Sequence, residues 1–165
     1  MVQNPHQGRA CGYGKGDYRS IDPVQTIIQI NSCRFPFNND WILCVTLWTV
    51  DNEGTPNKEV TKSRMVGNSI GESRYLYDLV GEPGSYFIFP TLFIRIPGLY
   101  KLQFRLIQVF SSDRKTLLPG TEVISTVFSD TFEVYPTKTF PGKSKPSVLM
   151  KVLAKQTHDV KSRSL

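Results

Sequence analysis

The chain begins with a stretch whose residue types could bind a phosphate or another anion. In RACGYGKGDYRSIDP (9–23), called here the glycine-rich segment, three glycines surround Lys15, and Asp17 and Arg19 follow. Glycine lets a backbone approach a ligand closely, while lysine and arginine extend from it toward negative charge. Asp17 could orient Arg19 by a salt bridge or accept a hydrogen bond from a cytosine amino group. Three interpretations are open: a nucleotide loop, a mobile leader, and a loop that holds cations against a polyanion.

The sequence context excludes the nucleotide loop. A phosphate loop of that kind follows a strand, ends in Gly-Lys-Ser/Thr and leads into a helix whose N-terminus meets the anion. GYGKG has neither this ending nor a helix signal after it. A loop whose charges only make it soluble and a loop for polyanion binding both remain open from spacing alone.

Residues that could carry out catalysis are few and scattered. The only histidines, His6 and His158, lie near the two ends of the sequence, where we expect no fixed geometry for general-base catalysis. The carboxylates of DNEG (51–54) and GEPG (81–84) form no recognisable acid–base pair, and DNEG is too short for a calcium loop. Three cysteines without a Cys-x-x-Cys motif predict neither a zinc site nor a disulfide framework. We therefore expect no enzyme activity, no cofactor and no metal.

The positive charge is confined to one part of the sequence. Residues 136–165 contain seven lysines and arginines against one acidic residue, Asp159, whereas residues 1–135 contain thirteen basic and thirteen acidic residues. The whole net charge of +6 therefore belongs to the last thirty residues. Such segregation favours a polyanionic partner, and a solvated tail without a partner is the alternative.

The middle of the chain predicts β-strands. In LYKLQFRLIQV (99–109), apolar and polar residues alternate, as they do in a strand with one buried face. Similar short runs, separated by glycine and proline turns, predict an all-β, immunoglobulin-like antiparallel β-sandwich. These runs are TIIQI (26–30), WILCVTLWTV (41–50), YFIFP (86–90), LFIRI (92–96), EVISTVF (122–128) and TFEVY (131–135). Residues 67–79 could form a short strand in a loop or a short helix.

Four aromatic residues, Trp41, Trp48, Phe87 and Phe89, are expected to fill the sandwich core, and a sugar-binding platform is the alternative. Cys44 stands in an apolar run and is expected to be buried.

One helix is predicted near the end of the sequence. Ser144 or Ser147 can cap it, and Pro146 suits its first turn. Its apolar stripe is expected to consist of Val148, Leu149, Val152 and Leu153. The domain is expected to span residues 9–157, after a flexible leader (1–8) and before a flexible basic tail (158–165). No apolar run is long enough to cross a bilayer, so we expect no membrane partner.

Four blocks of sequence, in order, resemble the velvet domain of fungal regulators. The glycine-rich segment is similar to the family's opening Arg-x-Cys-Gly-x-Gly-x-x-Asp-Arg-Arg-Pro-Ile-Asp-Pro signature, and VTLW (45–48) to its Ala-Ser-Leu-Trp strand. LVGEPGSYFIFPTLFIRIPGLYKLQFRL (79–106) is similar to its Gly-x-Phe-Phe-x-Phe-Pro-Asp-Leu block, and SDTFEVYPTKTFPGKSKPSVLMKVLAKQ (129–156) to its closing block and helix. The resemblance covers residues 9 to about 156.

The resemblance implies a fold like the Rel-homology domain of NF-kappa-B-type transcription factors, and a nuclear, double-stranded-DNA-binding regulator of fungal development and secondary metabolism. It also implies that the chain forms a homo- or heterodimer with another velvet protein. Some members of the family also bind a methyltransferase-like nuclear regulator. A fraction of the protein in the cytoplasm is compatible with the resemblance. The DNA-binding residues expected by position or charge are Arg9, Lys15, Asp17, Tyr18, Arg19, Lys138, Lys143 and Lys145.

The chain departs from the family pattern inside this signature. Where the family has Arg-Arg-Pro, this chain has Tyr18, Arg19 and Ser20, so one arginine is replaced by an aromatic residue. Tyr18 could stack or form a hydrogen bond instead. The alternative function is therefore an interaction module that dimerises with another velvet protein without reading DNA.

Overall fold

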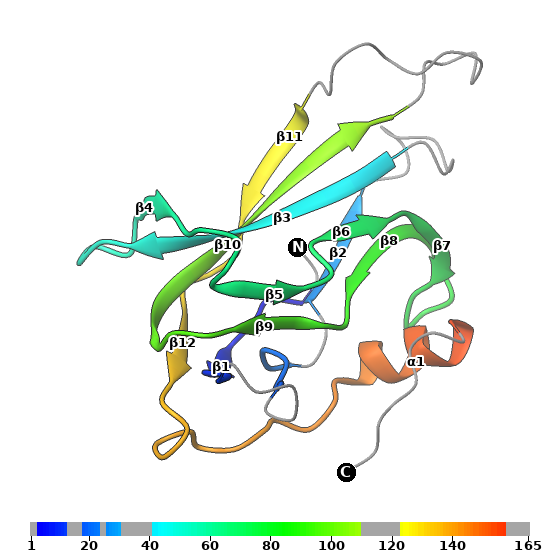
Figure 1. Ribbon diagram of the computed structural model, residues 1–165. Coiled ribbons are helices and arrows are strands. Elements are labelled where there is room, and N and C mark those ends of the chain that lie inside the picture. Colours follow the sequence, from blue (N-terminus) through cyan, green and yellow to red (C-terminus); the bar gives the residue numbers. More distant parts are fainter. Residues whose placement is uncertain (1–2, 13–17, 24–25, 31–40, 110–122, 158–165) are drawn as a thin grey trace.

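The computed structural model describes residues 3–12, 18–23, 26–30, 41–109 and 123–157 (Figure 1). Twelve strands and one helix lie in these ranges, and the strands form a large sheet, a three-stranded sheet and a two-stranded ribbon. The elements are β1 (Gln7–Arg9), β2 (Thr26–Ile30), β3 (Trp41–Val50), β4 (Pro56–Glu59), β5 (Met65–Gly67), β6 (Ile70–Glu72), β7 (Arg74–Tyr77), β8 (Pro83–Phe89), β9 (Leu92–Ile94), β10 (Gly98–Gln108), β11 (Val123–Phe128), β12 (Phe132–Tyr135) and α1 (Val148–Gln156).

The sheets confirm the predicted all-β sandwich. The large sheet has the order β1-β12-β10-β3-β4, and β11 and β6 pair with the free stretches of β10 and β3. The second sheet has the order β2-β8-β7, and β5 pairs with β9. Among the strands in the described ranges, every pairing is antiparallel except that of β1 with β12, which is parallel. The ambiguous stretch 67–79 forms strands, because its backbone pairs with β3 and β8.

Alternation along the two longest strands produces the core. Every second residue of β3 from Trp41 to Leu47, and of β10 from Tyr100 to Leu106, is buried against the second sheet. Phe104 meets Phe89 of β8 across this core, with ring centroids 5.8 Å apart. Each large apolar side chain buried in this way stabilises the fold by about 1.5–3 kcal/mol. The predicted core positions Trp41, Phe87 and Phe89 are confirmed.

The predictions for Trp48 and Cys44 are wrong, because both lie on the outward face of β3. Trp48 is half-buried, packs edge-on against Phe128 at 5.7 Å and donates from Nε1 to Thr46 Oγ1 at 3.0 Å. Cys44 is also only half-buried. The apolar run of β3 hides this alternation in the sequence, since the outward face also carries the hydrophobic or aromatic residues Ile42, Cys44 and Trp48.

Helix α1 covers the outer face of the three-stranded sheet (Figure 1). Ile27, Leu76 and Tyr86 of that sheet pack with Leu153 of the helix, in a second core separate from the first. TIIQI therefore contributes apolar residues to both of its faces, Ile28 to the main core and Ile27 to the helix.

Ser147 caps the helix, since its Oγ accepts from Met150 N at 3.1 Å, and Pro146 precedes the cap rather than lying in the first turn. The predicted apolar stripe is wrong at one position. Val148 is 66% exposed, and Met150 is buried with Leu153 instead. The sequence alone does not determine the buried face, because Val148, Leu149 and Met150 are all apolar. The position of the three-stranded sheet decides which face of the helix packs against it.

Residues 3–8, predicted as a flexible leader, make ordered contacts with the sandwich. Gln7–Arg9 adds a strand to the edge of the large sheet, and Gln3 pairs with Ile27. Asn4 exchanges hydrogen bonds with Asp130, from Nδ2 to Oδ2 at 2.7 Å and from Asp130 N to Oδ1 at 3.2 Å. Backbone groups and polar side chains supply these contacts, so no hydrophobic pattern in the sequence predicts them. The predicted basic tail (158–165) lies outside the described residues.

Ser129 replaces a strand hydrogen bond where β11 gives way to β12 beside β10. It is buried, its N–H donates to Leu102 O at 2.8 Å, and its Oγ accepts from Leu102 N at 2.9 Å. The same hydroxyl donates to Asp130 O at 2.7 Å. This side chain satisfies a buried N–H that the break between the two strands would otherwise leave unpaired.

We expect Ser129→Ala to lower the free energy of unfolding by roughly 1–3 kcal/mol, because the buried Leu102 N–H loses its acceptor. Urea denaturation followed by tryptophan fluorescence measures this. Ser125→Ala, an exposed serine on β11, is the matched control and should change stability by less than about 0.5 kcal/mol. Equal effects of the two substitutions would contradict the assigned role of Ser129.

Candidate nucleic-acid interface

The parallel pairing of β1 with β12 brings two basic segments to the same end of the sandwich. In this register Arg9 lies opposite Tyr135, and Ala10 N continues the pairing to Tyr135 O at 2.9 Å. Because the strands run in the same direction, the glycine-rich segment and the residues after β12 leave the sheet together. At this end β10 also begins and β3 ends.

Strand β9 holds both stems of the glycine-rich segment. Cys11 N donates to Ile94 O and Ile21 N donates to Leu92 O, both at 2.9 Å, while the other edge of β9 pairs with β5. Ser20 Oγ donates to Pro90 O at 3.2 Å. Cys11 is itself buried. The loop therefore starts and ends on a fixed strand.

The structure describes part of the predicted site in this segment. Arg9 is half-buried on β1, and Arg19 is exposed. Tyr18 is half-buried and places its ring against Phe93 of β9, with centroids 5.1 Å apart and planes at 34°. Tyr18 thus stacks on the protein itself, where the family signature has arginine. Lys15 and Asp17 lie outside the described residues.

We expect Tyr18→Ala to lower the free energy of unfolding by at least about 0.5–1.5 kcal/mol, since this variant lacks both the ring pair with Phe93 and its buried area. Chemical denaturation measures the change. Tyr18→Phe keeps the ring and is the matched control, for which stability should stay close to that of the parent chain. If the alanine and phenylalanine variants were equally stable, the ring contact would have no structural role.

The predicted lysines after β12 are exposed on the segment that follows the sheet. Lys138 lies in a turn closed by Thr139 N donating to Pro136 O at 3.1 Å, and Phe140 packs on Tyr135 with ring centroids 6.4 Å apart. Lys143 and Lys145 follow, both exposed, before helix α1.

Two further arginines, which no sequence motif singles out, lie at this end beside the β5–β9 ribbon. Arg95 donates from a terminal guanidinium nitrogen to Gly12 O at 2.9 Å, and its backbone N donates to Arg64 O. Arg64 is exposed and directly precedes β5. Burial raises the pKa of Tyr100, and the Arg64 charge offsets part of this rise. LFIRI predicts a strand but carries no sign that its arginine reaches a glycine more than eighty residues earlier.

Both edges at this end of the sandwich carry charges of both signs. The acidic DNEG turn connects β3 to β4, where Asp51 Oδ1 accepts from the backbone of Glu53 and Thr55. The cations of the candidate interface belong to the opposite edge, formed by β1 and β12, and to the adjacent ribbon, while the exposed Lys58 lies on β4 and the exposed Glu133 on β12. The exposed members are Arg19, Arg64, Lys138, Lys143 and Lys145. Such a set can neutralise several phosphates of one backbone while a loop reaches the bases.

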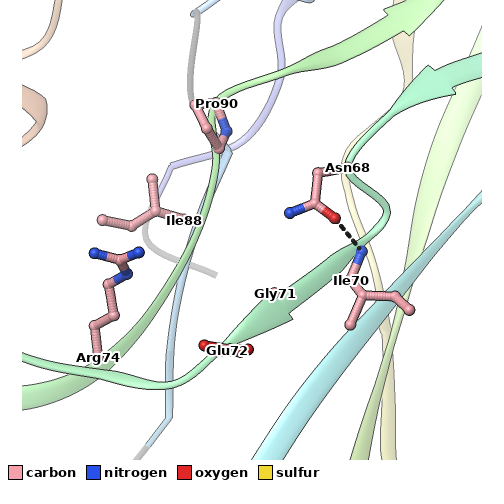
Figure 2. A pocket seen from close by; sticks show the side chains of 7 residues that line it. All are labelled: Asn68, Ile70, Gly71, Glu72, Arg74, Ile88 and Pro90. Carbon is pink, nitrogen blue, oxygen red and sulfur yellow. Dashed lines mark hydrogen bonds between the residues drawn. The ribbon is translucent and has the colours of Figure 1, made fainter. Parts of the chain in front are cut away.

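A cavity of about 440 Å³ lies elsewhere, between β6 and β8 (Figure 2). Its lining includes Glu72, Arg74, Ile88 and Asn68, whose Oδ1 accepts from Ile70 N at 3.3 Å. Among the described residues that line it there is no histidine, cysteine or serine, and none of the predicted DNA-binding residues. This lining therefore supplies no nucleophile with an adjacent base.

Over the described ranges, no three His, Cys, Asp or Glu side chains come together in a group that could hold a metal ion. In the same ranges the structure has no helix with the length and apolar character needed to cross a membrane.

Comparison with known proteins decides the family. The model of the velvet factor family matches residues 49–164. The chain belongs to this family. The match begins beyond the glycine-rich segment, so the velvet assignment does not depend on the opening signature.

Curated velvet relatives extend the similarity over nearly the whole chain. The sexual development regulator VELC of Pyricularia oryzae is 31% identical, with 93% of this chain and 38% of the relative covered. The spore development regulator vosA of Beauveria bassiana is 30% identical, with 93% and 61% covered. The developmental and secondary metabolism regulator VEL1 of Gibberella fujikuroi is 29% identical, with 99% and 35% covered. The chain thus spans about one third to three fifths of the length of these relatives.

Proposed function

We propose that this velvet chain is a non-enzymatic, nuclear DNA-binding regulator of fungal development that acts as a dimer with a second velvet protein. The observation that carries the proposal is the parallel β1–β12 pairing, which sends the glycine-rich segment and the basic residues after Tyr135 to one end. The names of the relatives, which are regulators of sexual development, spore development and secondary metabolism, support the regulatory role.

The arrangement fits duplex DNA better than a small anion. Its exposed cations come from three separate segments, the glycine-rich segment, the β5–β9 ribbon and the stretch after β12. Cations that come from several segments suit a polymer with many phosphates, whereas a small anion is held by converging donors in a pocket. Arg19, which has a planar guanidinium on the loop, is the described residue best suited to a guanine edge.

We expect the double variant Lys15→Ala, Arg19→Ala to bind duplex DNA more weakly by roughly 1–3 kcal/mol for each residue that contacts a base. Its plot of log affinity against log salt should become shallower by about 0.9 for each phosphate that the variant no longer neutralises. Fluorescence anisotropy at several salt concentrations measures both, on a duplex obtained by unbiased selection of bound sequences.

Arg74→Ala is the matched control for this experiment. Arg74 is exposed but follows Glu72, which pairs with Ile42 near the start of β3, at the other end of the large sheet. Its removal should leave the affinity and the salt slope unchanged. Unchanged binding by the Lys15, Arg19 double variant would show that the glycine-rich segment does not contact DNA.

A specific observation favours protein association as the second candidate function. Val123, Ile124 and Val127 of β11 are each 40–43% exposed, and VISTVF carries no charge, proline or glycine. Edge strands of this composition are usually covered, because their open backbone groups accept a further strand. The outward faces of the LFIRI and YFIFP strands are partly covered, since Phe93 packs against Tyr18 and Ile88 packs against the second core.

We expect Ile124→Lys to abolish dimer formation with a velvet partner, because a charge on an edge strand opposes strand addition. Sedimentation velocity of the mixed proteins measures the association. Val148→Lys, at the exposed start of helix α1, is the control for an added charge at an exposed valine and should leave the dimer intact. A dimer that withstands Ile124→Lys would mean that the association surface lies away from β11.

A further inference from the structure

We infer that Asp22 and Gln7 are positioning residues for the DNA interface, because they hold the backbone on both sides of Lys143 and fix this lysine beside the glycine-rich segment. The inference rests on the proposed function and goes beyond it by assigning a task to two side chains that do not themselves contact DNA. Neither belongs to the basic residues of the candidate interface.

Asp22 is a buried carboxylate, only 1% exposed, in the second stem of the glycine-rich segment. Its Oδ2 accepts from Ser144 N at 2.8 Å and from Gln7 Nε2 at 2.9 Å. A carboxylate taken out of water needs donors of this kind, and hydrogen bonds to an ionised acceptor are among the strongest in proteins. The Ser144 contact joins residues 122 positions apart in the sequence.

Gln7 completes the arrangement from strand β1. Its Nε2 donates a second hydrogen bond, to Gly142 O at 2.7 Å. The backbones of the two residues are also paired, since Asp22 N donates to Gln7 O at 2.7 Å and Gln7 N donates to Asp22 O at 3.2 Å. The paired backbones therefore fix the positions from which the two side chains extend. We call Asp22 and Gln7, together with Gly142 and Ser144, the Asp22–Gln7 clamp.

Lys143 is the residue between the two clamped positions. Gly142 O is held by Gln7 and Ser144 N by Asp22, while the Lys143 side chain is exposed. Gly142 has φ +106°, a conformation that glycine adopts without strain, and this lets the chain turn toward the clamp. The backbone of Lys143 is thus ordered before DNA arrives, so binding does not have to order it.

Ile21 and Asp22, near the end of the glycine-rich segment, have complementary structural roles. Ile21 is buried and its N–H fixes the stem to β9, so the next residue, Asp22, has a defined position from which to reach Ser144. One stem therefore holds the loop through its backbone and the lysine segment through its side chain. The separation between the two basic segments is fixed by this pair of residues.

The experiment is a double-mutant cycle with two readouts. The parent chain, Asp22→Ala, Lys143→Ala and the double variant are titrated with the selected duplex at several salt concentrations, and amide hydrogen exchange of Ser144 is followed by NMR without DNA. We expect each single variant to weaken binding about three- to tenfold and to reduce the salt slope by about one. The double variant should bind no more weakly than Lys143→Ala alone, because both changes remove the same interaction with DNA.

Two controls make the outcome specific. Lys138→Ala, in a separate turn, should add its full effect to that of Asp22→Ala, and Gln7→Ala should repeat the loss through the other arm of the clamp if Asp22→Ala fails to fold. Ser144 should lose its exchange protection in Asp22→Ala and keep it in Lys143→Ala.

Full additivity of Asp22→Ala with Lys143→Ala, or unchanged DNA affinity of Asp22→Ala, would overturn the positioning role. A Ser144 amide that stays protected in Asp22→Ala would overturn the clamp itself. If the parent chain bound no duplex, the proposed function would fail, and the exchange measurement would still decide whether the clamp exists.

Discussion

The parallel pairing of Gln7–Arg9 with Phe132–Tyr135 is the constraint on which the candidate interface depends. In the described part of the chain it is the one parallel contact in an otherwise antiparallel arrangement, and it joins strands from opposite ends of the sequence. An antiparallel pair at this edge would send the glycine-rich segment and the basic residues after Tyr135 to opposite ends of the sandwich. The parallel pair sends both the same way, and the contacts of Asp22 and Gln7 with residues 142–144 then hold them together.

Strands β10 and β9 and the side chain of Ser129 support this edge of the sandwich. β10 supports β12 through Gly98 to Tyr100, and Ser129 supplies a side-chain hydrogen bond where the strand partner of β10 changes from β11 to β12. On the other side, β9 anchors both stems of the glycine-rich segment. The loop that carries the cations is therefore fixed at both ends by backbone hydrogen bonds, which is how a scaffold presents a binding loop of high glycine content.

The two hydrophobic cores stabilise different contacts between the layers. The main core joins the two sheets through alternating residues of β3, β10 and β8, and the smaller core joins the outer face of the three-stranded sheet to helix α1. Docking of α1 places the stretch 136–147 between two anchored elements, β12 at one end and the helix at the other. Gln156 strengthens this docking, because its side-chain amide pairs with both the N–H and the carbonyl of Tyr77 at the edge of β7. The basic stretch 136–147 is thus held by β12, by helix α1 and by the contacts with Asp22 and Gln7.

Local patterns in the sequence were enough to predict β2, β3 and β8 to β12, the sandwich class, the capped helix and the segregation of charge, because period-two alternation, turn residues and composition are local properties. The order of the motifs also pointed to the velvet family. Folding in three dimensions was needed to establish which face of β3 is buried, why Tyr18 stands against Phe93, and that Arg64 and Arg95 join the basic end. The ordered N-terminal strand and the buried partners of Asp22 likewise became visible only in space. Their contacts are made by polar side chains and backbone groups far apart in the chain, and no periodicity records such pairings.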